Sequence, residues 1–303
     1  MNQLNYFYII ANKISYKLRK RNAALDKVAL LFLKIYFYGV QKFIKNNFSS
    51  LLNAQPESYP SQKNEKNIFV CWFQGEENAP DIVRACIKSA RKAAPQDSNV
   101  IILSEDNMLD YAKIPPAVID KYKKELITKT NFSDILRFAL LSQKGGAWMD
   151  STIFCSGSIN PELFDYQLYS IKNSNYDKFN IARRKWTAYF WFAKQNSYFT
   201  RRVFQFFCAY WEKYDALIDY FLVDHIIYFL YKNDPLCKEM LDSIPVNNPN
   251  VSFLQDCLSK EFDANEWNSL KENTCFFKLN WKSEIANKDK NTFYKEIICK
   301  ELS

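Results

Sequence analysis

The chain has 303 residues, of which 48% are hydrophobic and 24% are charged, and this composition excludes a disordered or fibrous protein. The formal net charge at pH 7 is +8, and it comes from residues 1–50, where nine Lys and Arg accompany one acidic residue, Asp26. The rest of the chain holds equal numbers of basic and acidic residues. A body that binds nucleic acid would show a basic face of its own, so we expect no nucleic-acid partner.

Residues 1–51 predict a basic, amphipathic helical segment. The longest apolar run, VALLFLKIYFYGV at 28–40, has thirteen residues and is interrupted by Lys34, which is short of the roughly 20 that a membrane-spanning helix needs. Apolar and aromatic residues interleaved with Lys and Arg suit helices that lie on an anionic membrane surface. A helical hairpin that packs on the main domain explains the pattern equally well. Residues 52–66 are polar with two prolines and predict a linker.

Residues 67–303 predict a single α/β domain. The run NIFVCWF at 67–73 is typical of a buried strand, a helical pattern fills 81–94, and NVIILS at 99–104 is a second buried strand. A strand, a helix and a strand with short connections predict a βαβ unit in a parallel sheet. Neither the glycine-rich dinucleotide motif nor the P-loop motif occurs in the sequence, so those two nucleotide-binding folds are disfavoured.

The most informative helix follows residue 131. Ser133 is expected to cap it, and Asp134 would then lie at the positive end of the helix dipole. Gly145 is expected to end it at the position where a left-handed residue is favoured. Asp134 and Arg137 are three positions apart, so their side chains should emerge from one helical face.

A short strand, 147–149, follows this helix, and Asp150 stands where the strand ends. In open α/β sheets ligands bind beyond the carboxyl ends of the strands. Asp134, Arg137 and Asp150 are therefore expected to converge on one crevice. An Asp–Arg pair on the surface of a helix and a separate strand-end carboxylate would give the same spacing, and the spacing alone does not reject that interpretation.

The second half is expected to be helical and strongly aromatic. A stripe of aromatic residues at helical spacing more often forms core than a platform for sugar rings. Asp219, Asp224 and His225 are polar residues among apolar neighbours, and a lone histidine in such a place is usually a hydrogen-bonded core residue. The aromatic stretches of this half are Tyr189–Phe192, Tyr198–Trp211 and Tyr220–Tyr231.

An ordered set of motifs runs through residues 67–282. The motifs are FSDILR-x₃-L-x₃-GG-x-W-x-D at 132–150, FVCWFQG at 69–75, APDIVRACIKS at 79–89, IDYFLVDH at 218–225 and FKLNWK at 277–282. Together they resemble the capsular polysaccharide synthesis proteins, a group similar to glycosyltransferase family 32. The resemblance implies a GT-A fold, a nucleotide-sugar donor, with a UDP-sugar favoured, and transfer of the sugar to a hydroxyl group with retention of configuration.

The resemblance also implies a divalent metal, Mn²⁺ or Mg²⁺, which would stabilise the charge on the leaving diphosphate. In the family's D-x-D signature the carboxylates meet the metal and the donor. Here the signature is Asp150-Ser151-Thr152, so Thr152 replaces the second carboxylate, and weaker metal affinity or a different division of ligands is expected. Asp150 is the first candidate ligand, and Thr152 and His225 are further candidates.

The other site residues follow from the same resemblance. Asp134 and Arg137 match positions that grip the donor sugar and its phosphate side, and we assign them with Asp150 to catalysis. Either Trp72 or Phe73 should face the nucleotide, because strand residues alternate between faces, and Phe73 is favoured. An edge strand with solvated lysines would also explain the last motif. The further candidate donor-binding residues are Gln74, Gly75, Thr152, Asp224, His225, Lys278, Asn280, Trp281 and Lys282.

These observations favour a bacterial-type glycosyltransferase that builds capsule or another surface polysaccharide on a glycan acceptor, expected to be lipid-linked. The eight cysteines form no C-x-x-C pair and no secretory leader is recognisable, so we expect free thiols and a cytoplasmic location, peripheral on the inner membrane face. A protein-modifying transferase and a non-catalytic sugar-binding or scaffold protein are the alternatives. No residue stands out as a covalent nucleophile, so front-face and double-displacement routes to retention both stay open.

Overall fold

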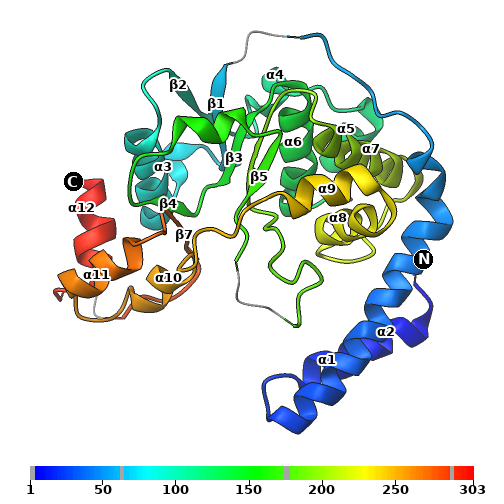
Figure 1. The fold of residues 1–303 in the computed structure, drawn as a ribbon, viewed down its shortest axis with the longest axis horizontal. Coiled ribbons are helices and arrows are strands. Elements are labelled where there is room, and N and C mark those ends of the chain that lie inside the picture. Colours follow the sequence, from blue (N-terminus) through cyan, green and yellow to red (C-terminus); the bar gives the residue numbers. More distant parts are fainter. Residues whose placement is uncertain (1–3, 62–64, 174–177, 287–289) are drawn as a thin grey trace.

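The computed structural model describes residues 4–61, 65–173, 178–286 and 290–303, and within them it has a mixed α/β fold (Figure 1). The strands are β1 (Lys66–Cys71), β2 (Ser98–Leu103), β3 (Gly146–Asp150), β4 (Ile153–Cys155), β5 (Leu168–Ser170), β6 (Phe190–Ala193) and β7 (Phe276–Lys278). The α-helices are α1 (Tyr6–Leu18), α2 (Ala23–Phe48), α3 (Asp81–Ala93), α4 (Met108–Tyr111), α5 (Pro116–Lys123), α6 (Lys129–Gln143), α7 (Tyr198–Lys213), α8 (Leu222–Asn233), α9 (Pro235–Asp242), α10 (Phe253–Cys257), α11 (Ala264–Lys271) and α12 (Lys300–Leu302).

A five-stranded sheet in the order β2-β1-β3-β6-β5 forms the centre. β1 pairs in parallel with both β2 and β3, whereas β6 runs antiparallel to β3 and β5. Four of these five strands therefore point the same way, which confirms the predicted mainly parallel sheet. The β1–α3–β2 unit is present as predicted, but β2 is an edge strand of the sheet and only Leu103 in it is buried, so the prediction of a second buried strand is wrong. α3 and α6 cover opposite faces of the sheet (Figure 1). β1 is buried from Asn67 to Cys71, as expected for a strand with helices on both faces.

α6 begins earlier than the sequence pattern predicts. Its N-cap is Thr128, whose side chain accepts from the backbone N–H of Asn131. Ser133 therefore lies inside the helix, where its hydroxyl donates to the carbonyl oxygen of Thr130 at 2.7 Å, and its predicted capping role is wrong. Both residues are common caps, and the extended backbone of Thr128 decides between them. The predicted end is confirmed, since Gly145 has a φ of +72° just after the helix.

The aromatic second half contains one strand where a helix was expected. Residues 190–193 form β6, which lies between β3 and β5 in the central sheet, and all four residues are buried. Four consecutive apolar residues are too few to distinguish a helix from a strand buried on both faces. α7 and α8 confirm the helical prediction for the other two stretches. The aromatic residues of α7 are core, as expected, and the buried ones are Phe199, Phe204, Phe206, Phe207, Tyr210 and Trp211.

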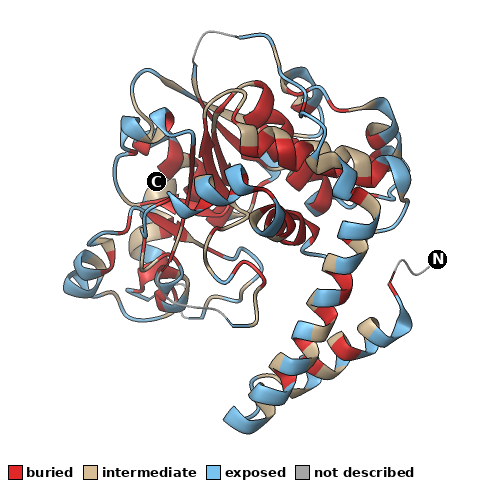
Figure 2. Ribbon diagram, turned by 45° about the vertical axis from the view of Figure 1, so that its right-hand side comes forward, coloured by how far each residue is buried: buried red, intermediate tan, exposed pale blue. Residues whose placement is uncertain are grey.

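α1 and α2 form a helical hairpin that extends away from the rest of the molecule (Figure 1). The C-terminal half of α2 packs on the main body, where Tyr36, Val40, Ile44 and Phe48 join the main hydrophobic core. The two helices approach so closely at Gly39 that a side chain there would meet the ring of Tyr8 at 2.4 Å. In the described part of the hairpin, buried residues lie where α1 and α2 face each other and where α2 meets the main body (Figure 2).

None of the helices in the described ranges is both long enough and apolar enough to cross a membrane.

Candidate active site

Two adjoining cavities open at the carboxyl ends of β1 and β3 in the described part of the chain. The outer cavity has a volume of about 650 Å³ and is lined by the residues that follow β1 and by the segment 278–282. The inner cavity has a volume of about 450 Å³ and lies among α6, α8 and the segment 180–189. Asp150, Tyr189 and Lys278 line both cavities and mark the place where they meet.

Asp150, the last residue of β3, is held by two cationic side chains. Its Oδ1 accepts from the indole N–H of Trp148 at 3.0 Å and from Nη2 of Arg137 at 3.1 Å, and its Oδ2 accepts from Nζ of Lys278 at 3.2 Å. Burial raises the pKa of Asp150, but the charges of Lys278 and Arg137 outweigh burial and leave this pKa below its ordinary value. Asp150 is therefore a carboxylate at neutral pH.

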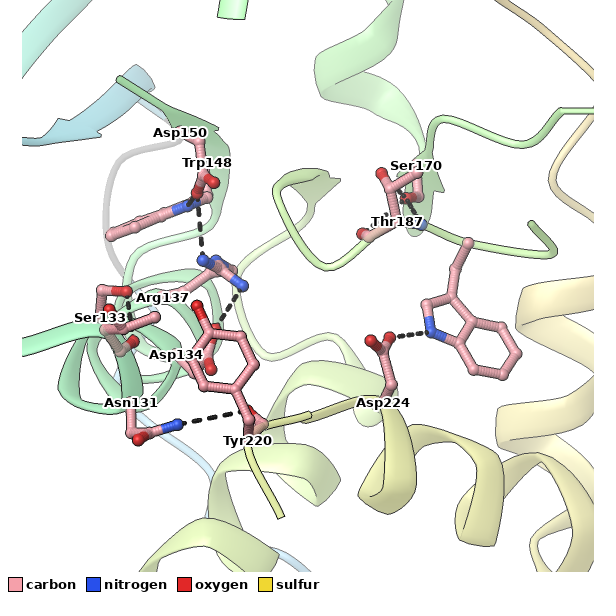
Figure 3. A network of polar contacts seen from close by, with 12 residues as sticks. Asn131, Ser133, Asp134, Arg137, Trp148, Asp150, Ser170, Thr187, Tyr220 and Asp224 are labelled. Atoms are coloured by element: carbon pink, nitrogen blue, oxygen red, sulfur yellow. Dashed lines mark hydrogen bonds and ion pairs between the residues drawn. The ribbon is translucent and has the colours of Figure 1, made fainter. Parts of the chain in front are cut away.

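Arg137 joins Asp150 to Asp134, as the sequence predicts (Figure 3). Its Nη1 donates to Oδ1 of Asp134 at 2.8 Å, and its guanidinium lies 5.0 Å from the ring centroid of Trp148. The guanidinium is buried, and its Nε has no partner among the described residues. Burial raises the pKa of Asp134 to about 7 although Arg137 opposes the shift, so this carboxyl group changes charge near neutral pH.

Asp224 brings a second carboxyl group with a raised pKa to the inner cavity (Figure 3). It stands in the first turn of α8, and its Oδ1 accepts from the indole N–H of Trp186 at 2.8 Å. Burial raises the pKa of Asp224 to about 6, although the hydrogen bond from Trp186 favours the charged form. The inner cavity thus combines two weakly acidic carboxyl groups with aromatic side chains.

His225 lines neither of the two cavities, although the sequence prediction places it among the donor-binding and metal-binding residues. Its Nδ1 lies 3.2 Å from Nε2 of Gln41, its Nε2 lies 3.6 Å from a carboxylate oxygen of Asp219, and its ring packs edge-on against Tyr36 and Phe37. Successive helical residues point about 100° apart. Asp224 therefore faces the inner cavity while His225 faces α2, as a hydrogen-bonded core histidine.

The predicted metal ligands do not assemble into a metal site. The Nζ of Lys278 donates to the hydroxyl of Thr152 as well as to Asp150, so one ammonium group bridges both residues of the altered signature. Across the described ranges, no group of three or more His, Cys, Asp or Glu side chains comes together in a way that could hold a metal ion. At phosphate-binding sites Mg²⁺ is held by one or two protein carboxylates, and substrate phosphates and waters supply its other ligands. Here the single carboxylate of the signature, Asp150, is already paired with Arg137 and Lys278, and the ammonium group of Lys278 also contacts Thr152. The residues present therefore do not fit a divalent cation.

Aromatic side chains form much of the wall of the outer cavity. Trp72 and Phe73 both line it, and Trp281 packs edge-on against Trp72 with ring centroids 5.4 Å apart. The expectation that only one of Trp72 and Phe73 faces the cavity is wrong, because β1 ends at Cys71 and strand alternation stops there. The other predicted residues that line this cavity are Gln74, Thr152, Lys278, Asn280 and Lys282.

Of the last three residues of the FVCWFQG motif, Gly75 alone does not line the outer cavity. Its φ is +82°, and a side chain built there would meet the carboxylate of Glu77. Its contribution is the turn that follows Gln74, since glycine adopts a positive φ without strain. The cavity contacts of this motif come from Cys71, Trp72, Phe73 and Gln74.

Sequence reasoning missed several residues of the site. Tyr189 lines both cavities, and Nζ of Lys278 lies 5.1 Å from its ring centroid. Arg184 lines the inner cavity and has a φ of +58°, a left-handed conformation that is uncommon outside glycine. Lys129, at the start of α6, lines the outer cavity. Tyr189 stands in an aromatic run that is typical of core, so no sequence signal distinguishes it.

Comparison with known proteins identifies a family for this chain. No curated protein matches the chain. The family model described as capsular polysaccharide synthesis protein matches residues 26–297, and this match begins inside α2 and contains every residue of both cavities. The chain therefore belongs to the capsular polysaccharide synthesis protein family.

Proposed function

We propose that this protein is a glycosyltransferase of the GT-A type that moves a sugar from a nucleotide-sugar donor to a hydroxyl group of a glycan, in the synthesis of capsule or another surface polysaccharide. The observation that carries the proposal is the pair of adjoining cavities at the strand ends, one aromatic and basic, the other lined by carboxyl groups. Family membership supports the role in polysaccharide synthesis.

The outer cavity suits a nucleoside diphosphate. Phe73 and Trp281 offer aromatic surfaces for a base, and UDP is the favoured nucleotide. Lys278 and Lys282 bring positive charges to the same cavity, which Lys129 also lines while paired with Glu105 at 2.7 Å. Ammonium groups form charge-assisted hydrogen bonds with phosphate oxygens. A diphosphate would then lie where the two cavities meet, next to Lys278.

The inner cavity suits the donor sugar. Asp134 and Asp224 can accept hydrogen bonds from sugar hydroxyls, and Trp186 and Tyr189 offer apolar ring surfaces. The acceptor oxygen forms the new bond to the anomeric carbon, and the bond from that carbon to the diphosphate oxygen breaks with its electron pair going to the diphosphate. In a front-face reaction the leaving phosphate takes the acceptor proton, so no protein nucleophile is needed.

The hairpin of α1 and α2 supports an acceptor held at a lipid surface. Its exposed side chains combine aliphatic and aromatic groups with lysines, which suits contact with an anionic membrane. Val28, Leu31 and Tyr38 are spaced along one side of α2 and are 42%, 58% and 61% exposed. The other exposed residues of this kind on the hairpin are Tyr6, Phe7, Ile10 and Tyr16. We propose that this surface rests on the inner face of the cytoplasmic membrane and brings the cavities to a lipid-linked glycan.

The test of the enzymatic function is release of free nucleotide from a panel of UDP- and GDP-sugars, with and without a lipid extract that supplies acceptors. One donor should be cleaved, and Asp150→Asn should lower the rate by at least about tenfold, because Arg137 and Lys278 lose the charge that positions them. Cleavage that needs an added protein substrate would favour a protein-modifying transferase. Binding of a nucleotide sugar without any cleavage would favour the non-catalytic alternative.

A further inference from the structure

We propose that Lys278 supplies the fixed positive charge that a divalent metal supplies at D-x-D sites, so that this protein binds and cleaves its donor without a metal ion. The inference deepens the proposed function and rests on it. It starts from one contact, the bridge that the Lys278 ammonium group makes between Asp150 and Thr152. These two residues are the first and last positions of the altered Asp150-Ser151-Thr152 signature.

The position of this ammonium group is set by backbone pairing. β7 runs antiparallel to β4, with Lys278 opposite Ile153, and the backbone N–H of Leu279 donates to the carbonyl oxygen of Thr152 at 2.8 Å. These contacts tie the chain around residue 278 directly to the end of the Asp150-Ser151-Thr152 signature. The side chain of Lys278 is 29% exposed, so the ammonium is anchored on one side and open to the cavities on the other.

The replacement of the second carboxylate fits this role. An aspartate at position 152 would place a second negative charge on the same ammonium and cancel the charge available to a ligand. The hydroxyl of Thr152 orients the ammonium and carries no charge. Asp150 is shared between Arg137 at 3.1 Å and Lys278 at 3.2 Å, so it neutralises the charge of Lys278 only in part.

The surroundings of Lys278 strengthen the effect on a diphosphate. The ring of Tyr189 lies 5.1 Å from Nζ, and aromatic faces attract cations. Lys282 lines the outer cavity with Lys278, so these two ammonium groups can share the charge of the leaving group. Lys129 lines the same cavity but is paired with Glu105 at 2.7 Å. Charged groups fixed before the reaction stabilise the developing charge without reorganising, which is the contribution that a metal ion otherwise makes.

The first test measures binding of UDP and of GDP by calorimetry, in EDTA and in Mn²⁺, for the wild type and Lys278→Met. The wild type should bind one nucleotide with equal affinity in both buffers, and Lys278→Met should bind it about 10- to 100-fold more weakly in both, as expected for loss of a charged hydrogen bond. Lys278→Arg should restore part of the affinity. Lys271→Met is the matched control, because Lys271 also lies over an aromatic ring, that of Trp267 at 5.4 Å, outside both cavities.

Two results would overturn the inference: binding that requires Mn²⁺ in the wild type, or unchanged affinity in Lys278→Met. Absence of nucleotide binding in both buffers would instead refute the proposed function itself, and the inference with it. A second experiment rebuilds the two-carboxylate signature with the double variant Thr152→Asp, Lys278→Met. This variant should bind Mn²⁺, followed by electron paramagnetic resonance, and its UDP affinity should become metal-dependent. An equal response to Mn²⁺ in the wild type and the double variant would contradict the inference.

Discussion

Replacing Arg137 with methionine should destabilise the protein far more than the same change at Arg84. Both arginines form an i,i+3 ion pair with an aspartate on a helix, Asp134–Arg137 at 2.8 Å and Asp81–Arg84 at 2.6 Å. The difference is exposure, because the arginine side chain is 3% exposed at position 137 and 48% exposed at position 84. The two substitutions therefore separate the effect of burial from that of residue type and spacing.

The magnitude follows from what each substitution leaves behind. Arg137→Met leaves two carboxyl groups, those of Asp134 and Asp150, without their shared cation, and breaking a buried pair in this way costs about 3–5 kcal/mol of unfolding free energy. Lys278 still contacts Asp150, and Asp134 can take up a proton, so we expect about 3 kcal/mol at pH 8 and less at pH 5.5. Arg84→Met should cost at most about 1 kcal/mol, as exposed ion pairs do.

The assay is urea denaturation of both variants and the wild type at pH 5.5, 7 and 8.5, followed by circular dichroism. The cost of Arg137→Met should grow as the pH rises, because Asp134 is deprotonated there and its charge is unpaired. Equal costs for the two variants, or a cost of Arg137→Met that does not change with pH, would refute the description of the Asp134–Arg137–Asp150 network as a buried electrostatic unit.

Further predictions concern three other parts of the structure. Burial raises the pKa of Asp224 to about 6, so the folded state binds this proton more tightly than the unfolded state does, and the stability of the protein falls as the pH rises from about 4 to about 6. Asp224→Asn should remove up to about 3 kcal/mol of that fall in urea denaturation. An unchanged pH profile of stability in the variant would refute the raised pKa. Leu31→Ser should weaken binding to anionic liposomes about tenfold in sedimentation, because apolar contact with the membrane is lost. The control Leu236→Ser, at a 53% exposed site on the main body, should leave binding unchanged. Equal effects of the two substitutions would contradict the proposal that the hairpin binds the membrane. Trp281→Ala should lower nucleotide affinity about 10- to 100-fold, as loss of base stacking does, and an unchanged affinity would exclude Trp281 from the base site.

The sequence predicts the first βαβ unit well because local pattern determines it. β1, α3 and β2 each carry an unbroken apolar run or stripe between clear breaks. The errors arise where two local choices are nearly equal. Thr128 and Ser133 are both good caps, and residues 190–193 are too few to show a helical or strand period. Packing decides both cases.

The site is predicted only as far as local spacing reaches. Asp134, Arg137 and Asp150 lie within seventeen positions of one another, so helix and strand geometry brings them together as expected. The contact of Lys278 with Asp150 joins residues 128 positions apart and depends on the pairing of β7 with β4. No periodicity in the sequence reports that pairing. For the same reason the sequence does not show which of Asp224 and His225 faces the inner cavity, because that depends on how α8 is rotated against α2.

A crystal structure of the protein with bound UDP and the sugar that the donor carries tests the central claim most directly. The claim is that the two adjoining cavities form one donor site with its reacting bond at their junction. The base should lie in the outer cavity beside Phe73 and Trp281, the diphosphate within hydrogen-bond distance of Lys278, and the sugar in the inner cavity near Asp134. A nucleotide bound elsewhere, or a diphosphate far from Lys278, would contradict this account.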